Sequence, residues 1–279
     1  MLTRRKFITR SSAATAASFL LPPFSITSRL KEDYGVQLYT FRDAMLKDAK
    51  GTLEEIAKIG IKKIESARSK EGLYYGLSPK EMQTTCNTLG MQLISGHVAL
   101  DEKFQNTMEQ AVASGQEYVI CSSMPSSGQY IDNYKAVAEQ FNKAGEACKK
   151  LGLKFGYHNH EYEFETDKGQ VLYDILMDET DPELVHMELD LGWVVVAGKD
   201  PLAYFKKYPG RFPLWHLKDM NMKKKESTEF GKGGLDITTM MKRRKQSGVA
   251  HIFIEQEEYA SSPIKSMRHN MAFLDHMNL

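Results

Sequence analysis

The sequence predicts an α/β protein with a single (β/α)8 TIM barrel over residues 31–279, after an N-terminal signal segment over residues 1–30. Three observations lead to this prediction. Eight short apolar runs alternate with longer amphipathic stretches, the chain length fits one barrel of about 250 residues, and polar residues recur where the runs end. With 42% hydrophobic and 26% charged residues, the composition is that of a globular protein with a substantial core.

The first element is the predicted signal segment. Paired arginines, Arg4 and Arg5, precede Phe7 and a weakly apolar stretch that ends at Pro22 and Pro23. This arrangement resembles a twin-arginine export signal. The apolar part is shorter than the roughly 20 residues that cross a bilayer, so we expect an exported, periplasmic protein without a permanent membrane span.

The predicted strands come next. Each of the eight runs is short and rich in apolar or β-branched residues, as expected of parallel strands that are buried on both faces. The runs cover residues 34–39, 61–66, 92–97, 118–122, 154–158, 185–190, 214–218 and 252–256.

Helix signals lie between these runs. Thr52 and the acids that follow it open one predicted helix, which Gly60 closes, and Ser78 with Pro79 opens the next. Further helices are predicted over residues 130–151, from Asp200 and Pro201, over residues 236–246, and from Ser262 and Pro263.

The alternation of strands and helices favours a closed barrel. Crossovers between parallel strands are nearly always right-handed, so eight successive units close most naturally into a ring. A doubly wound open sheet is the structural alternative. It receives less support, because no G-x-G-x-x-G motif follows the first predicted strand.

The charge balance excludes one class of partner. The 37 Lys and Arg residues nearly equal the 36 Asp and Glu residues, and the formal net charge is +1. Such a chain has no global field that attracts nucleic acid, so we expect no nucleic-acid partner, and any anionic partner must be recognised locally. The sequence leaves open whether copies of the chain form a homo-oligomer.

Polar residues follow the predicted strands at their carboxyl ends, where barrels of this type carry their chemistry. His97, His158 and Asp190 end the third, fifth and sixth runs, and His216 and Glu255 lie near the ends of the seventh and eighth. Such groups are unfavourable at buried strand ends unless they share a charge or face water. Their imidazole and carboxylate groups suit a divalent metal ion such as Mn2+, Mg2+ or Zn2+.

Four segments carry a resemblance to a known family. They are GYHNHEYEF at residues 156–164, MELDLGW at 187–193, GRFPLWHLKDM at 210–220 and FIEQ at 253–256. The chain resembles the sugar phosphate isomerase/epimerase family, within the xylose isomerase-like TIM barrels, over nearly its whole length after the signal. That superfamily also includes AP endonuclease 2-type enzymes.

The resemblance implies a set of metal ligands. The family uses a carboxylate after strand five, Asp after six, His after seven and Glu after eight, which correspond here to Glu163, Asp190, His216 and Glu255. The last three match directly. The first position departs from the pattern, because His158 stands where many relatives have Glu, so His158 or His160 could bind the ion instead.

The resemblance also implies an activity. Relatives isomerise, epimerise or dehydrate ketoses and cyclitols, and some eliminate a substituent from 3-keto-glycosides. These reactions remove a proton from a carbon beside a carbonyl, and the resulting enediolate must be stabilised. We therefore expect a divalent-metal-dependent sugar isomerase or epimerase, or a related lyase or dehydratase, that acts on a ketose, keto-glycoside or cyclitol.

Individual roles follow from this chemistry. His158 or His160 is the expected base because imidazole titrates near neutral pH, and Glu255 is a second candidate. Lys218 would place a positive charge near substrate oxygens, and Trp193 could stack on a sugar face. The weaker candidates for substrate contacts are His97, Gln37 and Glu65. Glycines within residues 231–234 could let the backbone approach a substrate closely.

Two other functions compete with this hypothesis. A non-catalytic sugar-binding barrel would keep the polar rim and Trp193 without an organised base. A phosphodiesterase similar to the endonuclease branch would need a basic surface for nucleic acid. The retained acidic and imidazole groups argue against the first alternative, and the near-neutral charge argues against the second.

Overall fold

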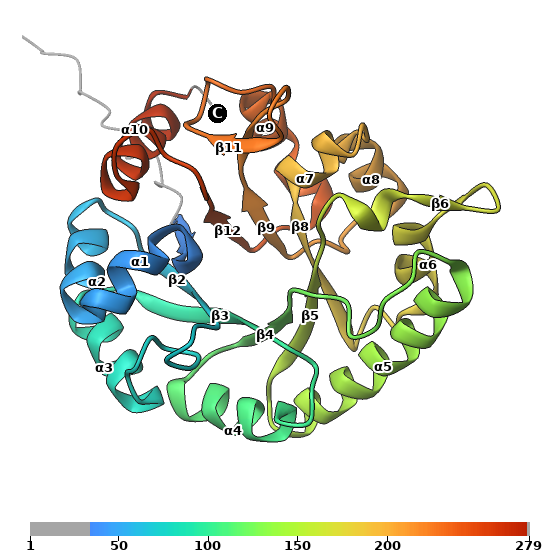
Figure 1. The fold of residues 1–279 in the computed structure, drawn as a ribbon, viewed down its shortest axis with the longest axis horizontal. Helices are drawn as coiled ribbons and strands as arrows, with labels where there is room; N and C mark the ends of the chain where they lie inside the picture. The colour runs from blue at the N-terminus through green and yellow to red at the C-terminus, as the bar shows by residue number, and fades with distance from the viewer. Residues whose placement is uncertain (1–33, 278–279) are drawn as a thin grey trace, which may run out of the picture. The chain divides into compact units, whose positions relative to one another are not determined.

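A closed barrel of eight parallel strands, surrounded by helices, forms the centre of the molecule (Figure 1). The computed structural model describes residues 34–277. Around the barrel the strands follow the order β1-β12-β9-β8-β5-β4-β3-β2, so the first and last strands along the chain pair with each other. The predicted (β/α)8 TIM barrel is therefore confirmed.

Each of the eight predicted apolar runs overlaps one barrel strand, and three strands extend one residue beyond their run. The strands are β1 (Gly35–Gln37), β2 (Lys63–Ala67), β3 (Gln92–Val98), β4 (Tyr118–Cys121), β5 (Lys154–His158), β8 (Val185–Asp190), β9 (Leu214–Leu217) and β12 (His251–Ile254).

Helices connect consecutive strands around the outside of the ring (Figure 1). They are α1 (Arg42–Lys47), α2 (Ala49–Lys58), α3 (Pro79–Thr88), α4 (Phe104–Ser114), α5 (Ile131–Lys150), α6 (Leu172–Glu179), α7 (Leu191–Val196), α8 (Pro201–Lys207), α9 (Ile237–Ser247) and α10 (Pro263–His276). The 3-10 helices Leu38–Phe41 and Tyr162–Phe164 follow β1 and β5.

Local capping explains where the helices begin. Ser78 and Glu81 form a reciprocal capping box at the start of α3, with Pro79 in the first turn, as the sequence predicts. The start of α2 differs from the prediction. Its cap is Asp48, whose side chain accepts a hydrogen bond from the Gly51 amide, so the helix begins three residues before Thr52.

The barrel interior has an apolar lower part and a polar upper part. Ile94, Tyr118, Ile120, Leu214 and Phe253 form a buried cluster of their own, separate from the larger core, which includes outward-facing strand residues and buried helix residues. Because side chains alternate along a strand, the inward-facing residues nearer the carboxyl ends form the next layers, and these are mostly polar. The apolar cluster thus supports a polar site above it.

Two short hairpins extend the loops at the carboxyl ends of the strands. They are β6 (Thr166–Asp167) with β7 (Gln170–Val171), after β5, and β10 (Asp219–Asn221) with β11 (Glu226–Thr228), after β9. The second hairpin is held to the loop after β12, because Ser227 donates a hydrogen bond to Glu258 and accepts one from the Glu257 amide.

No helix within residues 34–277 is both long enough and apolar enough to cross a membrane. The predicted signal segment and the predicted domain boundary at residue 31 lie outside the described residues.

Candidate active site

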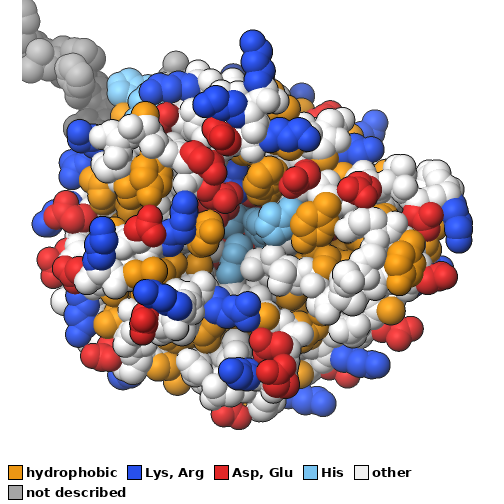
Figure 2. Space-filling model, viewed as in Figure 1, with side chains coloured by type: hydrophobic (Ala, Val, Ile, Leu, Met, Phe, Trp, Pro, Cys, Tyr) orange, Lys and Arg blue, Asp and Glu red, His pale blue; other side chains and the backbone are white. Residues whose placement is uncertain are grey.

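A pocket of about 340 Å³ opens at the carboxyl ends of the barrel strands. Six of the residues predicted for the site line it, namely His97, His158, His160, Trp193, Lys218 and Glu255. Tyr39, Arg68 and Glu257 line it too, although the sequence had not singled them out. In Figure 2 the histidine side chains are visible within a hollow of the surface.

Four predicted donors converge at the base of this pocket. His158, Asp190, His216 and Glu255 each offer one ligand atom, and these atoms all lie within 4.8 Å of one another. His216 Nδ1 is 3.0 Å from His158 Nε2 and 2.9 Å from Glu255 Oε2. Ligands bound at about 2.0–2.2 Å to one ion lie roughly 3 Å apart, so these spacings fit a shared divalent cation.

Strand geometry explains why these donors meet. Asp190 ends β8 and lies directly beside His216 of β9 in the parallel ladder. Its Oδ1 caps α7 by accepting the Trp193 amide, which leaves Oδ2 directed toward His158 Nε2 at 3.4 Å. Asp190 Oδ2 is buried and accepts no hydrogen bond of good geometry from the described residues, although the Lys218 ammonium lies 3.1 Å from it. A buried carboxylate oxygen that is paired only with a charge is the kind of atom that a cation would bind.

Lys218 supplies a fixed positive charge beside this group. Its ammonium lies 3.1 Å from Asp190 Oδ2, 2.8 Å from Glu255 Oε2 and 2.7 Å from Glu257 Oε1, and it also lies over the Trp193 ring. Burial opposes the charge of Lys218, but the three carboxylates outweigh it and hold the pKa of the lysine well above its usual value. Lys218 is therefore charged at neutral pH.

His158, which ends β5, and His160, which follows it, are both held neutral. Burial, followed by the charges of neighbouring histidines, lowers the pKa of His158 well below its usual value. Burial and then the Lys218 charge lower the pKa of His160 to about 4. Nδ1 of each ring has no hydrogen-bond partner among the described residues. Both rings can therefore offer a lone pair to a ligand at neutral pH.

Glu163 lies outside this group, so its predicted role as a ligand is revised. One oxygen of Glu163 accepts a hydrogen bond from the Tyr157 hydroxyl, and the other accepts the His160 amide at 2.8 Å. Burial raises the pKa of Glu163 to about 7. The 3-10 turn after β5 thus directs this carboxylate into the loop, and His158 stands at the strand-five position.

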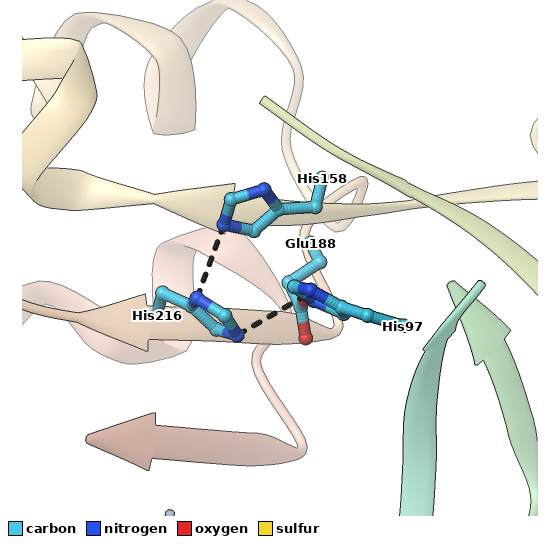
Figure 3. Close-up of side chains that lie close together, drawn as sticks. All are labelled: His97, His158, Glu188 and His216. Carbon is cyan, nitrogen blue, oxygen red and sulfur yellow. Dashed lines mark hydrogen bonds and ion pairs between the residues drawn. The ribbon is translucent and has the colours of Figure 1, made fainter. Parts of the chain in front are cut away.

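A second polar layer lies beneath the pocket. His97 Nε2 contacts Glu188 Oε2 at 2.8 Å and Glu65 Oε1 at 3.2 Å, while His216 Nε2 contacts Glu65 Oε1 at 2.6 Å. Figure 3 shows His216 between His158 on one side and Glu188 with His97 on the other. Ligand atoms of His97, His158, Glu188 and His216 form a second group that could hold a metal.

Gln37 and Glu65 belong to this lower layer, so their predicted substrate contacts are revised as well. Both side chains are fully buried, and Gln37 donates a hydrogen bond of 2.8 Å to Glu65. Glu188 was missed as a site residue. Its position two residues before Asp190 on the same strand could have revealed it, because residues i and i+2 share a face.

The loop over residues 231–234 does not act as the sequence suggested. Gly231 and Gly233 donate their backbone amides to Asp219, at 2.9 and 3.0 Å. A Cβ at Gly233 would lie 2.2 Å from an Asp219 oxygen. The glycines therefore let the backbone approach Asp219 closely, and no residue of this loop lines the pocket.

The chain was compared with known protein families. Residues 53–277 match the family described as "Xylose isomerase-like TIM barrel". The chain belongs to this family. Together with the eight-stranded barrel, the match confirms the xylose isomerase-like TIM barrel that the resemblance implied.

Curated relatives of this xylose isomerase-like barrel include inosose dehydratases. The protein of that name from Clostridium perfringens (strain 13 / Type A) is 38% identical over 105 residues. That match covers 37% of this chain and 35% of the relative. The chain thus spans only about a third of the length of the first such relatives.

Solved structures share the fold over nearly the whole barrel. A sugar phosphate isomerase/epimerase from Parabacteroides distasonis ATCC 8503 superposes with a TM-score of 0.77 at 24% identity, covering 91% of this chain and 97% of that one. The IolI protein, solved with a bound zinc atom, gives a TM-score of 0.68 at 14% identity, with 86% and 96% coverage. At these identities the likeness shows the fold alone.

Proposed function

We propose that this chain is a divalent-metal-dependent enzyme that removes a proton beside a carbonyl of a ketose, keto-glycoside or cyclitol, in an isomerisation, epimerisation or dehydration. The observation that carries the proposal is the convergence of His158, Asp190, His216 and Glu255 at the base of the pocket. The inosose dehydratase relatives and the zinc-bound IolI neighbour support it.

The donor set indicates what kind of ion would fit. Two imidazoles, which bind a metal ion in their neutral form, and two carboxylates suit Zn2+, Mn2+ or a similar divalent ion. A bound ion of this kind would act as a Lewis acid on substrate oxygens and stabilise negative charge that develops on them. His158, Asp190, His216 and Glu255 would hold it, with His158 in place of the predicted Glu163.

Residues on the pocket wall would perform the proton transfer. His160 lines the pocket and has a ring nitrogen without a hydrogen-bond partner among the described residues, so it is our proposed proton acceptor on grounds of position. The Lys218 ammonium points a permanent positive charge into the same pocket, where it would stabilise a developing enediolate. Trp193 provides an apolar wall for a sugar face.

The test is solvent proton exchange with the metal-loaded protein. Inososes, ketoses and 3-keto-glycosides are incubated with the protein and Mn2+ or Zn2+ in D2O, and deuterium at substrate carbon is followed by NMR. We expect incorporation in at least one substrate. Sugar binding without exchange or turnover would instead support the non-catalytic sugar-binding barrel.

Two variants separate the role of a base from that of a ligand. His160→Gln should retain its metal and lose about 100-fold or more of the exchange rate, because only the proton acceptor is removed. His216→Ala should lose metal and activity together. His186→Gln is the matched control, since His186 is also a partly buried histidine of lowered pKa but does not line the pocket. Normal exchange by His160→Gln would contradict the assignment.

We also propose export through a twin-arginine route. The support is the Arg4-Arg5 pair, Phe7 and the weakly apolar stretch that follows them. Replacing both arginines by lysine should retain the protein inside the cell while leaving its fold unchanged. Fractionation of cells that produce the two forms checks this, and equal export of both forms would contradict it.

A further inference from the structure

His216 lies between the two polar layers and contacts each through a different ring nitrogen. Nδ1 faces the upper donors, at 2.9 Å from Glu255 Oε2 and 3.0 Å from His158 Nε2. Nε2 faces the lower layer, at 2.6 Å from Glu65 Oε1. The ring is fully buried, so neither nitrogen exchanges its partner for bulk water.

A neutral imidazole can offer a lone pair from only one nitrogen, because the other carries the proton. Which nitrogen carries it depends on the acceptor that each one meets. Both nitrogens of His216 face a carboxylate, Glu65 at 2.6 Å from Nε2 and Glu255 at 2.9 Å from Nδ1. If a cation bound Glu255 and took the Nδ1 lone pair, the Glu65 carboxylate would hold the remaining proton on Nε2. A carboxylate that holds the proton on Nε2 in this way orients the metal-binding histidine without contacting the metal ion itself.

Glu65 is itself held in place from two sides. Gln37 Nε2 donates to Glu65 Oε1 at 2.8 Å, and the Ser95 hydroxyl donates to Glu65 Oε2 at 2.6 Å. The amide of Gln37 is oriented in turn, because its oxygen accepts the Tyr39 backbone N–H at 3.1 Å. These contacts connect the backbone after β1 to the ring of His216 on β9.

Glu188 is the other carboxylate near Nε2, and its geometry fits a different partner. Its Oε2 lies 3.3 Å from His216 Nε2 but 2.8 Å from His97 Nε2. In the lower layer Glu65 is thus the carboxylate nearest to His216 and Glu188 the one nearest to His97, while Glu65 Oε1 also lies 3.2 Å from His97 Nε2. A cation in this lower layer would need the Nε2 lone pair of His216, which is incompatible with Nδ1 binding the upper cation.

We propose that Glu65 is a positioning residue that keeps the proton on Nε2 of His216 and so turns the Nδ1 lone pair toward the metal position defined by His158, Asp190 and Glu255. The inference rests on the proposed function, because it assigns how one ligand of that site is oriented. It extends that function by giving a buried residue beneath the pocket control over metal affinity.

The experiment compares the same chemical change at two buried carboxylates of one layer. Zn2+ affinity and stoichiometry are measured by titration against a competing chelator for the wild type, Glu65→Gln and Glu188→Gln. Loss of an outer partner of a ligating histidine typically weakens binding about 10- to 100-fold. We expect that loss for Glu65→Gln, a change of less than about threefold for Glu188→Gln, and one Zn2+ per wild-type chain.

A measurement on the wild type keeps the test independent of whether a variant folds. In the Zn2+-loaded protein, long-range 1H–15N spectra of 15N-histidine-labelled protein report which nitrogen of His216 carries the proton. We expect the proton on Nε2 and the metal on Nδ1. A metal on Nε2, or an equal loss of affinity in both variants, overturns the proposal and favours the lower group as the metal site.

The outcomes also separate this inference from the proposed function. A wild-type protein that takes up no divalent metal overturns both. A wild type that binds one Zn2+ while Glu65→Gln binds it equally well overturns only the role of Glu65. Circular dichroism of each variant in chelator confirms that the compared proteins are folded.

Discussion

Lys218 lies where a buried ammonium and a divalent cation would share the same carboxylate oxygens. Its nitrogen contacts Asp190 Oδ2 and Glu255 Oε2, two of the atoms that converge toward the metal position. In the protein without metal, this ammonium contributes positive charge that balances the buried carboxylates of Asp190 and Glu255. With a cation present, its charge repels that cation at short range.

Replacement of Lys218 by Met should therefore act in opposite directions on the two forms. The metal-free form should lose about 3–5 kcal/mol of stability, because buried carboxylates are left without their counter-charge. Metal affinity should rise by at least roughly tenfold, because the repulsion is gone. Denaturant unfolding in chelator and in excess Zn2+ measures both effects; equal stability of wild type and Lys218→Met in chelator would contradict this interpretation.

The positions of the candidate site residues could be predicted from the sequence only in part. Asp190, His216 and Glu255 were predictable because each lies within one residue of the carboxyl end of its strand, and a barrel brings such ends together. Glu163 was not, because its direction depends on a contact with Tyr157 that forms only in the folded turn. Glu65 lies two residues before the end of β2, so it sits below the pocket rather than on its wall.

At the level of elements, Asp219 organises the segment between β9 and α9. Its two oxygens accept four backbone amides, those of Met220, Gly231, Gly233 and Leu235, at 2.9 to 3.0 Å. The carboxylate is fully buried, so no water can replace these donors. It thus fixes the path of a loop that has few apolar residues of its own.

Asp219→Asn tests this anchor. The amide keeps one acceptor oxygen and introduces donors next to backbone N–H groups, so about two charge-assisted hydrogen bonds are lost. At about 1.5–3 kcal/mol for each hydrogen bond to a charged group, we expect a loss of roughly 3–6 kcal/mol in urea unfolding. Asp236→Ala, which removes only an exposed helix cap, is the control, with an expected loss of about 1 kcal/mol.

Element type was easier to predict from the sequence than element boundaries. Near-continuous apolar runs located all eight strands, because parallel strands that are buried on both faces consist mainly of apolar residues. The start of α2 was misplaced, since both Thr52 and Asp48 are good caps and only the fold shows which amide each one meets. The small hairpins were missed because their strands of two or three residues carry no periodic signal.

At the level of the whole molecule, two histidines near the amino ends of the strands should make stability depend on pH. Burial, followed by nearby lysines, lowers the pKa of His186 and of His251 to about 4. Between about pH 6.5 and 4 the unfolded chain binds protons that the folded protein does not. Stability should therefore fall as the pH decreases through that window.

The measurement is urea unfolding from pH 7 to pH 4 in the presence of chelator. The double variant His186→Gln with His251→Gln should show a shallower decrease than the wild type, because two groups that take up protons on unfolding are absent. His276→Gln, a change at an exposed position near the end of α10, should follow the wild-type curve. A double variant with the wild-type slope would contradict the assignment.

The closure of the ring by β1 and β12 has a consequence for assembly. All four proposed ligands come from the second half of the chain, whereas the carboxylate that orients one of them comes from β2. Two fragments of this protein, cut between β4 and β5, would each lack part of that arrangement. Tight binding of a metal ion would then require that the two fragments associate, so metal affinity could be used to measure whether the complete barrel has formed.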